Sequence, residues 1–314
     1  MSFNIKRKIL SFFLIFIIAA LPLSGCLEQK KETRVGIAWR SDQTAESFTA
    51  TVAAVEEAGG EAVVLDMVKS KDLNYDGEKL LNATLDNGCL SEEAANSIKS
   101  TSWQNSNVKE VVGDLEAIVF PGGEDISPTL IDAYKEEDVK VVEGYSAERD
   151  VSDYLLMSYC LDNDLAVLAI CRGMQLLSVV SGASIINDIP TYFNEMGIEY
   201  NYEHRNEPES PGAYRDFSFH DVKLTDKDSL LYSLVKNDVI KDVPSWHHQA
   251  VKDIENTKLK VTAIRNTCGV DMIEAVERPD KSFVLGLQFH PEIAVVRGLD
   301  DLSICYFKAI VSYA

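Results

Sequence analysis

The sequence has few basic residues for its length. Its 314 residues include 30 Lys and Arg against 50 Asp and Glu, which gives a formal net charge of -20. Such a surface repels the phosphates of nucleic acids and anionic lipid head groups, so we expect neither as a partner. A small acidic ligand would be repelled as well, and a site for one would need positive groups gathered locally.

Cysteine is also scarce, and its spacing excludes two classes of protein. The six cysteines lack both the paired spacing of zinc-binding motifs and the dense pattern of small disulfide-stapled proteins. Cys160 and Cys305 lie in apolar, helix-like stretches and are expected to be buried. Whether a disulfide forms among Cys89, Cys160, Cys268 and Cys305 stays open. The sequence contains no repeats and no low-complexity segment.

The one long apolar run is at the N-terminus. Lys6-Arg-Lys8 precedes the apolar stretch from Ile9 to Ala20, and Leu23-Ser-Gly-Cys26 follows it. This order predicts a secretory signal peptide over residues 1–25. The closing tetrapeptide resembles the bacterial lipobox, whose cysteine is lipidated, so Cys26 is the expected membrane anchor of an extracytoplasmic protein. An uncleaved anchor is the alternative, although the stretch is short for a membrane span.

Removal of the signal would change the net charge to -23, because the signal carries three basic and no acidic side chains. Residues 26–33 would then form a short tether that keeps the folded domain close to its membrane.

From residue 34 onward, short apolar runs alternate with helical patterns. A strand at 34–39, a helix at 45–58 and a strand at 62–65 form a βαβ opening. This alternation predicts a parallel sheet in one α/β domain spanning residues 34–314. The polar residues 67–113, with a helix near 91–100, are predicted to form a surface insertion.

The later elements follow the same alternation, except for a loop predicted at 187–215. Further strands are predicted at 116–120, 165–170, 217–224, 258–264, 270–276 and 283–289. Further helices are predicted at 151–161, after Cys171, and at 299–313.

Cys171 lies where the apolar run Ala166–Ile170 turns into helix-like sequence. Its thiol is expected to project over the carboxyl edge of the sheet, beside free N–H groups that favour a thiolate. Arg172 would add positive potential, and Gly173 permits the tight turn. On this stretch alone, a buried cysteine that merely ends a core strand is an equal alternative.

A second stretch changes that balance. His290 and Glu292 are separated by Pro291 after an apolar run. Residues i and i+2 of an extended chain face the same way, so the carboxylate can orient the imidazole, and Pro291 fits a strand end. With Cys171 they predict the Cys–His–Glu triad of a cysteine hydrolase.

Backbone donors for an oxyanion are predicted at two turns. The turn Pro121-Gly-Gly123 follows a predicted strand and exposes N–H groups, and Gly123 could supply one donor. The N–H of Arg172 could supply the other. By itself, a turn of this composition is common.

Four motifs occur in the order found in class I glutamine amidotransferase-like proteins. They are Pro121-Gly-Gly-Glu-Asp-Ile-Ser-Pro128, Cys171-Arg-Gly-Met-Gln175, Trp246-His-His-Gln249 and His290-Pro-Glu292. The chain most resembles the peptidase C26 branch, the γ-glutamyl-γ-aminobutyrate hydrolase-like group. The resemblance runs from about residue 34 to the C-terminus, apart from most of 67–113. It implies a doubly wound, mostly parallel, flavodoxin-like sheet with helices on both faces.

The resemblance also implies a reaction, the hydrolysis of a γ-glutamyl amide through a thioester. Cys171 would be the nucleophile, His290 the base and Glu292 the residue that orients it. Gln175 and the stretch His247-His248-Gln249 would line the glutamyl pocket. Neither a metal nor an organic cofactor is expected.

Several details of the resemblance stay open. Adjacent residues on a strand face opposite ways, so at most one of His247 and His248 is expected to meet substrate. His204 and His220 are expected to be structural or exposed. The segment Pro128-Thr-Leu-Ile131 and the lipobox depart from the usual hydrolase pattern, which leaves the leaving-group amine undetermined.

Two other functions stay open on the sequence alone. Many bacterial lipoproteins bind solutes without catalysis, but such a receptor would leave the His-Pro-Glu motif unexplained. A glutaminase subunit that feeds ammonia to a synthase would fit the motifs but not an extracytoplasmic position. The expected ligand is a small γ-glutamyl compound, and the sequence leaves the oligomeric state open.

Overall fold

The computed structural model describes residues 33–132, 134, 144–210 and 213–314. The chain divides into two units, Met1–Lys31 and Glu32–Ala314, of which the second is described below. The predicted signal peptide, the lipidation site Cys26 and nearly all of the tether lie outside the described residues. Within the ranges that the structure describes, no helix is both long enough and apolar enough to cross a membrane.

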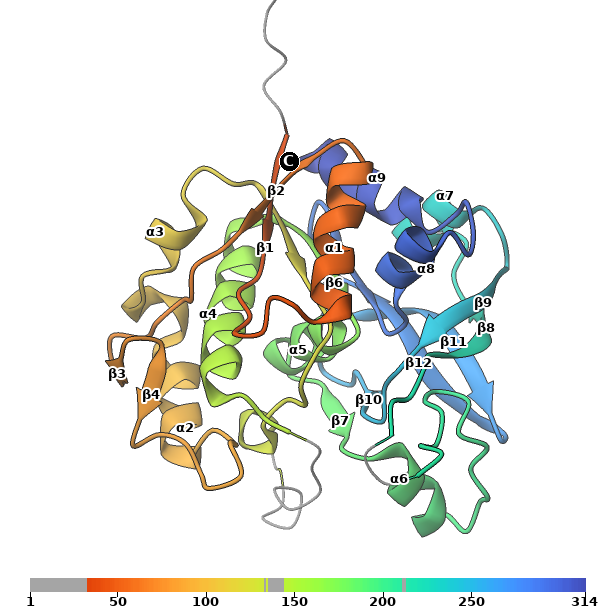
Figure 1. The fold of residues 1–314 in the computed structure, drawn as a ribbon, viewed down its shortest axis with the longest axis horizontal. Coiled ribbons are helices and arrows are strands. Elements are labelled where there is room, and N and C mark those ends of the chain that lie inside the picture. Colours follow the sequence, from red (N-terminus) through yellow and green to blue (C-terminus); the bar gives the residue numbers. More distant parts are fainter. Residues whose placement is uncertain (1–32, 133, 135–143, 211–212) are drawn as a thin grey trace, which may run out of the picture. The chain divides into compact units, whose positions relative to one another are not determined.

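A nine-stranded sheet runs through the Glu32–Ala314 unit (Figure 1), in the order β2-β1-β5-β6-β13-β12-β11-β8-β9. The first five strands in that order are parallel, and the remaining pairings are antiparallel. In chain order the strands are β1 (Arg34–Ile37), β2 (Glu61–Val64), β5 (Ala117–Phe120), β6 (Ala166–Ile170), β8 (Ser218–Leu224), β9 (Val239–Ser245), β11 (Lys260–Thr267), β12 (Val270–Glu277) and β13 (Val284–Leu287).

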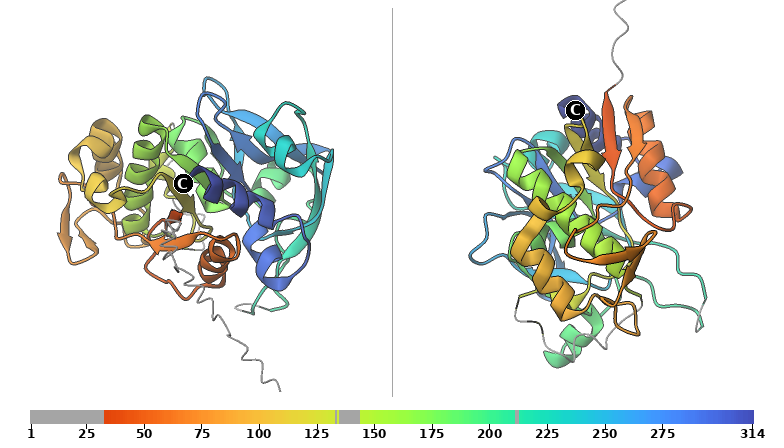
Figure 2. Two further views of the ribbon diagram at one scale, coloured as in Figure 1. Left: turned by 90° about the horizontal axis from the view of Figure 1, so that it is seen from above. Right: turned by 90° about the vertical axis from the view of Figure 1, so that its left-hand side faces the viewer.

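Helices cover both faces of this sheet (Figures 1 and 2). Side chains alternate along β5, so that Ile118 and Phe120 pack toward α4 and α5, while Ala117 and Val119 pack toward α1 and α9. The helices are α1 (Glu46–Glu57), α2 (Glu92–Thr101), α3 (Val108–Val112), α4 (Ala147–Asn163), α5 (Arg172–Val180), α6 (Ile189–Glu195), α7 (Leu230–Val235), α8 (Pro291–Arg297) and α9 (Ile304–Tyr313), with short 3₁₀ helices at Ser102–Asn105 and Pro128–Leu130. The predicted doubly wound α/β fold is therefore confirmed.

Residues 67–113 pack on the outer side of α4. They contain the hairpin of β3 (Asn74–Asp76) and β4 (Lys79–Leu81), followed by α2 and α3. Leu80 and Ile98 are buried in the same apolar cluster as Leu155 of α4. The segment therefore extends the core instead of lying loosely over it.

Sequence patterns missed several short elements. The predicted loop at 187–215 contains α6, whose N-cap Asp188 accepts a hydrogen bond from Thr191 N at 2.9 Å. The patterns also missed α7, β9 and a small antiparallel pair formed by β7 (Ser184–Ile186) and β10 (Ala250–Asp253). These elements are too short to show a period.

The parallel half of the sheet positions the site. Strands β1, β5, β6 and β13 point the same way, so their carboxyl ends share one edge. The residues that follow these strands are Arg40 after β1, Gly122 after β5, Cys171 after β6 and His290 after β13. In an open α/β sheet this edge is where ligands bind.

The turn from β6 into α5 is sharply strained. Cys171 is the N-cap of α5 and has φ 51° and ψ -106°, a backbone conformation that residues other than glycine rarely adopt. Two residues later the helix passes so close to β5 that a Cβ on Gly173 would lie 2.4 Å from the backbone oxygen of Phe120. This close approach requires glycine at position 173.

Replacement of Gly173 by alanine should therefore destabilise the protein by about 1–3 kcal/mol through overpacking. In an open helix the same change would stabilise by roughly 1 kcal/mol, so the sign of the effect is diagnostic. Urea unfolding measures it. Gly144→Ala is the matched control, because its added Cβ meets nothing within 4 Å among the residues that the structure describes. Equal stabilities for the two variants would contradict the tight approach.

Candidate active site

The structure brings the three predicted triad residues together. Cys171, His290 and Glu292 are all buried, although they come from two turns far apart in the chain. A Cβ placed on Gly122 would lie 2.9 Å from His290 Cε1 and 3.4 Å from Cys171 Cβ, so both side chains meet beside this glycine. Gly122 thus leaves room for the imidazole next to the thiol.

The contact between His290 and Glu292 has a different geometric basis from the predicted one. His290 is the N-cap of α8, Pro291 is its first residue and Glu292 lies in its first turn, so the extended i, i+2 arrangement is wrong. Pro291 fits here because the first helical position needs no N–H donor. The helical turn still brings His290 Nδ1 to 2.7 Å from Glu292 Oε1.

This hydrogen bond fixes the roles of the two ring nitrogens. Nδ1 donates to Glu292, while the buried Nε2 has no hydrogen-bond partner among the described residues and is the nitrogen available to the thiol. Burial lowers the pKa of His290, but the charges of Glu292 and Cys171 outweigh burial and raise it to about 10. The site therefore favours an imidazolium beside the cysteine at neutral pH.

Backbone N–H groups next to Cys171 are oriented by a buried arginine. Arg149 Nη2 donates to the carbonyl oxygens of Pro121 at 2.8 Å and Gly122 at 3.0 Å. In a trans peptide the N–H points opposite to the carbonyl, so the Gly123 N–H is directed away from Arg149. Gly123 and Cys171 line the same cavity.

The Arg172 side chain turns away from the thiol. Its guanidinium is buried and donates to Asp150 Oδ1 at 2.6 Å and to Asp153. Two carboxylates therefore balance its charge, and its expected positive potential at Cys171 is offset. Its backbone N–H belongs to the first turn of α5, where helical N–H groups lack partners within the helix.

A cavity of about 540 Å³ opens above Cys171 and His290. Side chains of both charge signs and several aromatic rings line it, although the protein as a whole is strongly acidic. The positive side chains are Arg40, Arg205 and Arg215, the negative ones Glu46, Glu124 and Asp125, and the aromatic ones Tyr214, Phe217 and Trp246. A zwitterionic ligand would find partners for both of its charges here.

The predicted pocket residues all border this cavity, but each makes different hydrogen bonds within the protein. Gln175 donates through Nε2 to Gln249 O at 3.0 Å. His247 and His248 lie between β9 and β10, outside any strand, and turn in different directions. His247 Nδ1 lies 2.8 Å from Gln249 O, whereas His248 lies 2.9 Å from Asp125 and 3.1 Å from Asp188.

Sequence reasoning missed the charged part of the cavity wall. Arg40 could have been predicted from the sequence, because it follows the strand β1 and therefore lies at the carboxyl edge of the sheet. Arg205 and Arg215 come from the irregular segment between α6 and β8, where no periodic pattern marks an inward-facing side chain. Arg205 lies 5.4 Å from the centre of the Trp246 ring, a cation–π distance.

The question of a disulfide, which the sequence left open, is answered for the five described cysteines. Cys89, Cys160, Cys171, Cys268 and Cys305 are all free thiols. Cys160 is fully buried, as predicted, whereas Cys305 is partly exposed.

The contact of His248 with Asp125 and Asp188 predicts a pH-dependent stability. Burial lowers the pKa of His248, but the two carboxylates outweigh burial and raise it to about 9. A raised pKa means that this stabilisation is complete below the unfolded value near 6.5 and is lost as the pH rises through about 9. We expect the stability difference between wild type and His248→Gln, about 1–3 kcal/mol near pH 6, to shrink as the pH rises through that value. Urea unfolding across that pH range measures it, and a constant difference would contradict the interpretation.

Comparisons with known proteins place the chain in a family. The family model described as peptidase C26 matches residues 95–292, which include Cys171, His290 and Glu292. Protein NtpR of Enterococcus hirae is 33% identical over 182 residues, covering 58% of this chain and 69% of that protein. The γ-glutamyl-γ-aminobutyrate hydrolase of Escherichia coli O157:H7 is 28% identical over 216 residues, covering 68% and 77%.

Among solved structures, a glutaminase domain of Trypanosoma brucei CTPS with bound acivicin aligns over 89% of this chain and 94% of that chain. The TM-score is 0.48 and the identity 16%, too low to add to the fold described above. The family match covers well over half of this chain, and the sequence resemblance is thereby confirmed. The chain belongs to the peptidase C26 family, within the glutamine amidotransferase-like proteins.

Proposed function

We propose that this protein hydrolyses γ-glutamyl amides through a thioester on Cys171. The observation that carries the proposal is the state of His290. It is buried, holds Glu292 through Nδ1 and leaves Nε2 to the cysteine at the base of an open cavity. A noncatalytic solute receptor would have no need to bury such a pair.

The charges of the cavity support a γ-glutamyl substrate. The α-amino acid end of a γ-glutamyl group carries one carboxylate and one ammonium group. Arg205 and Arg215 are suited to the carboxylate. Glu124 and Asp125 supply negative charge for the ammonium group, although Glu124 already pairs with Arg40 and Arg149, and Asp125 with His248. The relative named as a γ-glutamyl-γ-aminobutyrate hydrolase supports the same substrate class.

In the first half of the proposed reaction, the Cys171 thiolate attacks the γ-carbonyl carbon. Negative charge develops on the carbonyl oxygen, where the N–H groups of Gly123 and Arg172 would stabilise it. The carbon–nitrogen bond then breaks, and the imidazolium of His290 donates its Nε2 proton to the departing amine. The products of this half are a free amine and a thioester.

In the second half, neutral His290 takes a proton from water as the water oxygen attacks the thioester carbon. The carbon–sulfur bond breaks, which releases the glutamyl acid and returns the thiolate and imidazolium. Glu292 holds Nδ1 throughout, so that Nε2 stays directed at the reacting atoms.

We further propose that the enzyme is secreted and anchored to the membrane by a lipid on Cys26. This proposal rests on the sequence of the first 26 residues. It would place the hydrolase where it meets extracellular or periplasmic γ-glutamyl compounds.

Covalent labelling tests the role of Cys171. We expect a γ-glutamyl electrophile such as 6-diazo-5-oxo-L-norleucine to add one label per chain, located on the Cys171 peptide by mass spectrometry. Cys171→Ala should lose the label, together with about a thousandfold or more of the hydrolysis rate. Cys268→Ala, which removes an exposed thiol, is the matched control and should keep both. A label that persists in Cys171→Ala would remove this residue from the nucleophile role.

The pKa of His290 predicts the alkaline side of the pH profile. Because His290 acts first as an acid, kcat/KM should fall as the pH rises through about 10. Glu292→Gln removes the carboxylate that raises this pKa, so the fall should move to lower pH, and kcat/KM should drop about 10²–10⁴-fold. Hydrolysis of a chromogenic γ-glutamyl anilide from pH 6 to 11 measures both. An unshifted fall in the variant would contradict the role of Glu292.

A further inference from the structure

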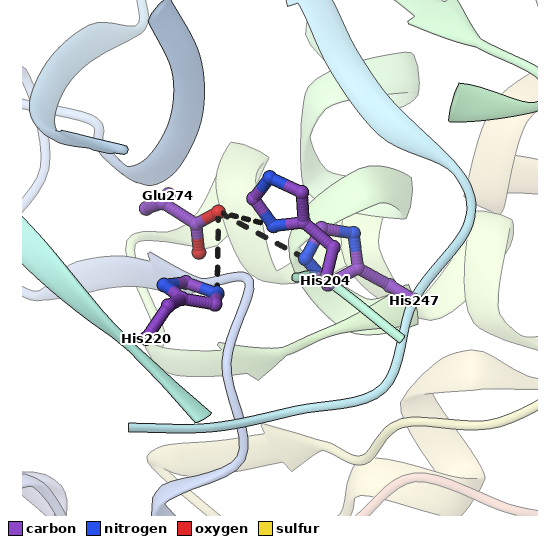
Figure 3. Close-up of side chains that lie close together, drawn as sticks. All are labelled: His204, His220, His247 and Glu274. Atoms are coloured by element: carbon purple, nitrogen blue, oxygen red, sulfur yellow. Dashed lines mark ion pairs between the residues drawn. The ribbon is translucent and has the colours of Figure 1, made fainter. Parts of the chain in front are cut away.

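Three histidines and one glutamate converge in a buried cluster apart from the triad (Figure 3). His204, His220, His247 and Glu274 each contribute one atom, and these four atoms lie within 4.8 Å of one another. Glu274 Oε1 is 3.2 Å from His204 Nδ1 and 3.9 Å from the Nε2 atoms of His220 and His247. All four residues are almost completely buried.

The converging atoms have no hydrogen-bond partner in the part of the chain that the structure describes. They are His204 Nδ1, His220 Nε2, His247 Nε2 and both carboxylate oxygens of Glu274. A buried polar atom without a partner costs about 1–3 kcal/mol, and more when it is charged. A ligand that all of these atoms can bind at once would remove this free-energy cost.

The outward-facing nitrogens of the three rings do have partners. His247 Nδ1 lies 2.8 Å from Gln249 O, and His220 Nδ1 lies 3.4 Å from Asp221 O. A carbonyl oxygen only accepts, so these nitrogens carry the hydrogen and the Nε2 atoms present lone pairs to the centre. His204 Nε2 lies 2.7 Å from the buried Thr267 hydroxyl. This is the outer hydrogen bonding that orients metal-binding histidines.

We propose that these four residues bind a divalent transition metal ion, with Zn²⁺ as the best match. Three imidazole nitrogens and one carboxylate oxygen form a typical tetrahedral zinc set. With metal–ligand distances near 2.0–2.1 Å, tetrahedral ligand atoms lie about 3.4 Å apart. The separations of 3.2 and 3.9 Å from Glu274 Oε1 are close to that spacing. The four atoms lie within 4.8 Å of one another, so the imidazole nitrogens would draw closer together on binding.

A proton is the simplest rival to a metal. A hydrogen on one ring nitrogen, best placed at His204 Nδ1, would be donated to Glu274 Oε1. That pair leaves the Nε2 lone pairs of His220 and His247 facing a carboxylate with no donor between them. A metal ion satisfies all four groups at once, and for that reason we favour it.

The proposed site is structural. Four protein ligands close the coordination sphere, whereas a catalytic zinc keeps a position for water. The ligands join the segment before β8, the strand β8, the loop between β9 and β10, and the strand β12. His247 itself lines the cavity, between Trp246 and His248, so the ion would stiffen the cavity wall.

Metal analysis of the full-length protein, purified in detergent, tests the proposal. After dialysis against a weak chelator we expect about one zinc per chain. Glu274→Gln and His220→Asn should lower zinc affinity at least a hundredfold, and Thr267→Val, which removes only an outer hydrogen bond, about 10–100-fold. His248→Gln is the matched control, since it changes a buried histidine outside the cluster, and it should keep its zinc.

Two further measurements do not require the variants to fold. A strong chelator should lower the Tm of the wild-type protein, and added zinc should restore it. Co²⁺ added to the chelated protein should give the visible absorption of a four-coordinate site. The absence of stoichiometric zinc together with no Co²⁺ spectrum would overturn the proposal. Zinc that stays bound in the Glu274→Gln, His220→Asn and Thr267→Val variants alike would overturn it as well.

Discussion

Two buried arginines hold together the parts on which the proposed chemistry depends. Arg149, in α4, donates hydrogen bonds to the Pro121 and Gly122 carbonyl oxygens and also pairs with Glu124 at 2.6 Å. Arg172, at the start of α5, pairs with Asp150 and Asp153 of α4. Helix α4 thus fixes the positions of both turns beside the thiol, the Pro121–Gly123 turn and the turn from β6 into α5. Removing one partner of a buried pair leaves an uncompensated charge, which costs about 3–5 kcal/mol.

The sequence predicted the parts of the site that follow directly from sheet geometry. An apolar run that turns into helical sequence placed Cys171 at the carboxyl edge, and the parallel order brought His290 to the same edge. The contact with Glu292 was predicted on an incorrect basis, because Pro291 begins a helix instead of ending a strand. Both geometries bring the carboxylate to Nδ1, so the motif was informative even though the predicted local structure was wrong.

The remaining parts could not be predicted, because they depend on contacts between distant segments. His204, His220, His247 and Glu274 share no short motif. The antiparallel pairing of β8, β11 and β12 brings His220 and Glu274 together. The loops that carry His204 and His247 meet where the His247 N–H donates to His204 O at 3.1 Å. Antiparallel register is set by side-chain packing across strands, which a single sequence does not display. Arg205 and Arg215 are hidden for a related reason, since an irregular segment has no period that marks its buried face.

The histidine cluster and Cys171, the proposed nucleophile, are connected through hydrogen bonds. The Gln288 N–H donates to Glu274 O at 2.8 Å, and Gln288 Oε1 accepts from Gln175 Nε2 at 3.3 Å. Gln175 Nε2 also donates to Gln249 O, which accepts from His247 as well. Gln175 lies one helical turn after Cys171, and its N–H donates to Cys171 O at 3.1 Å. A shift of His247 or Glu274 would therefore reach the first turn of α5, where the thiol and one predicted oxyanion donor are fixed. The antiparallel half of the sheet thus supports the geometry of the proposed nucleophile, Cys171, which the parallel half carries.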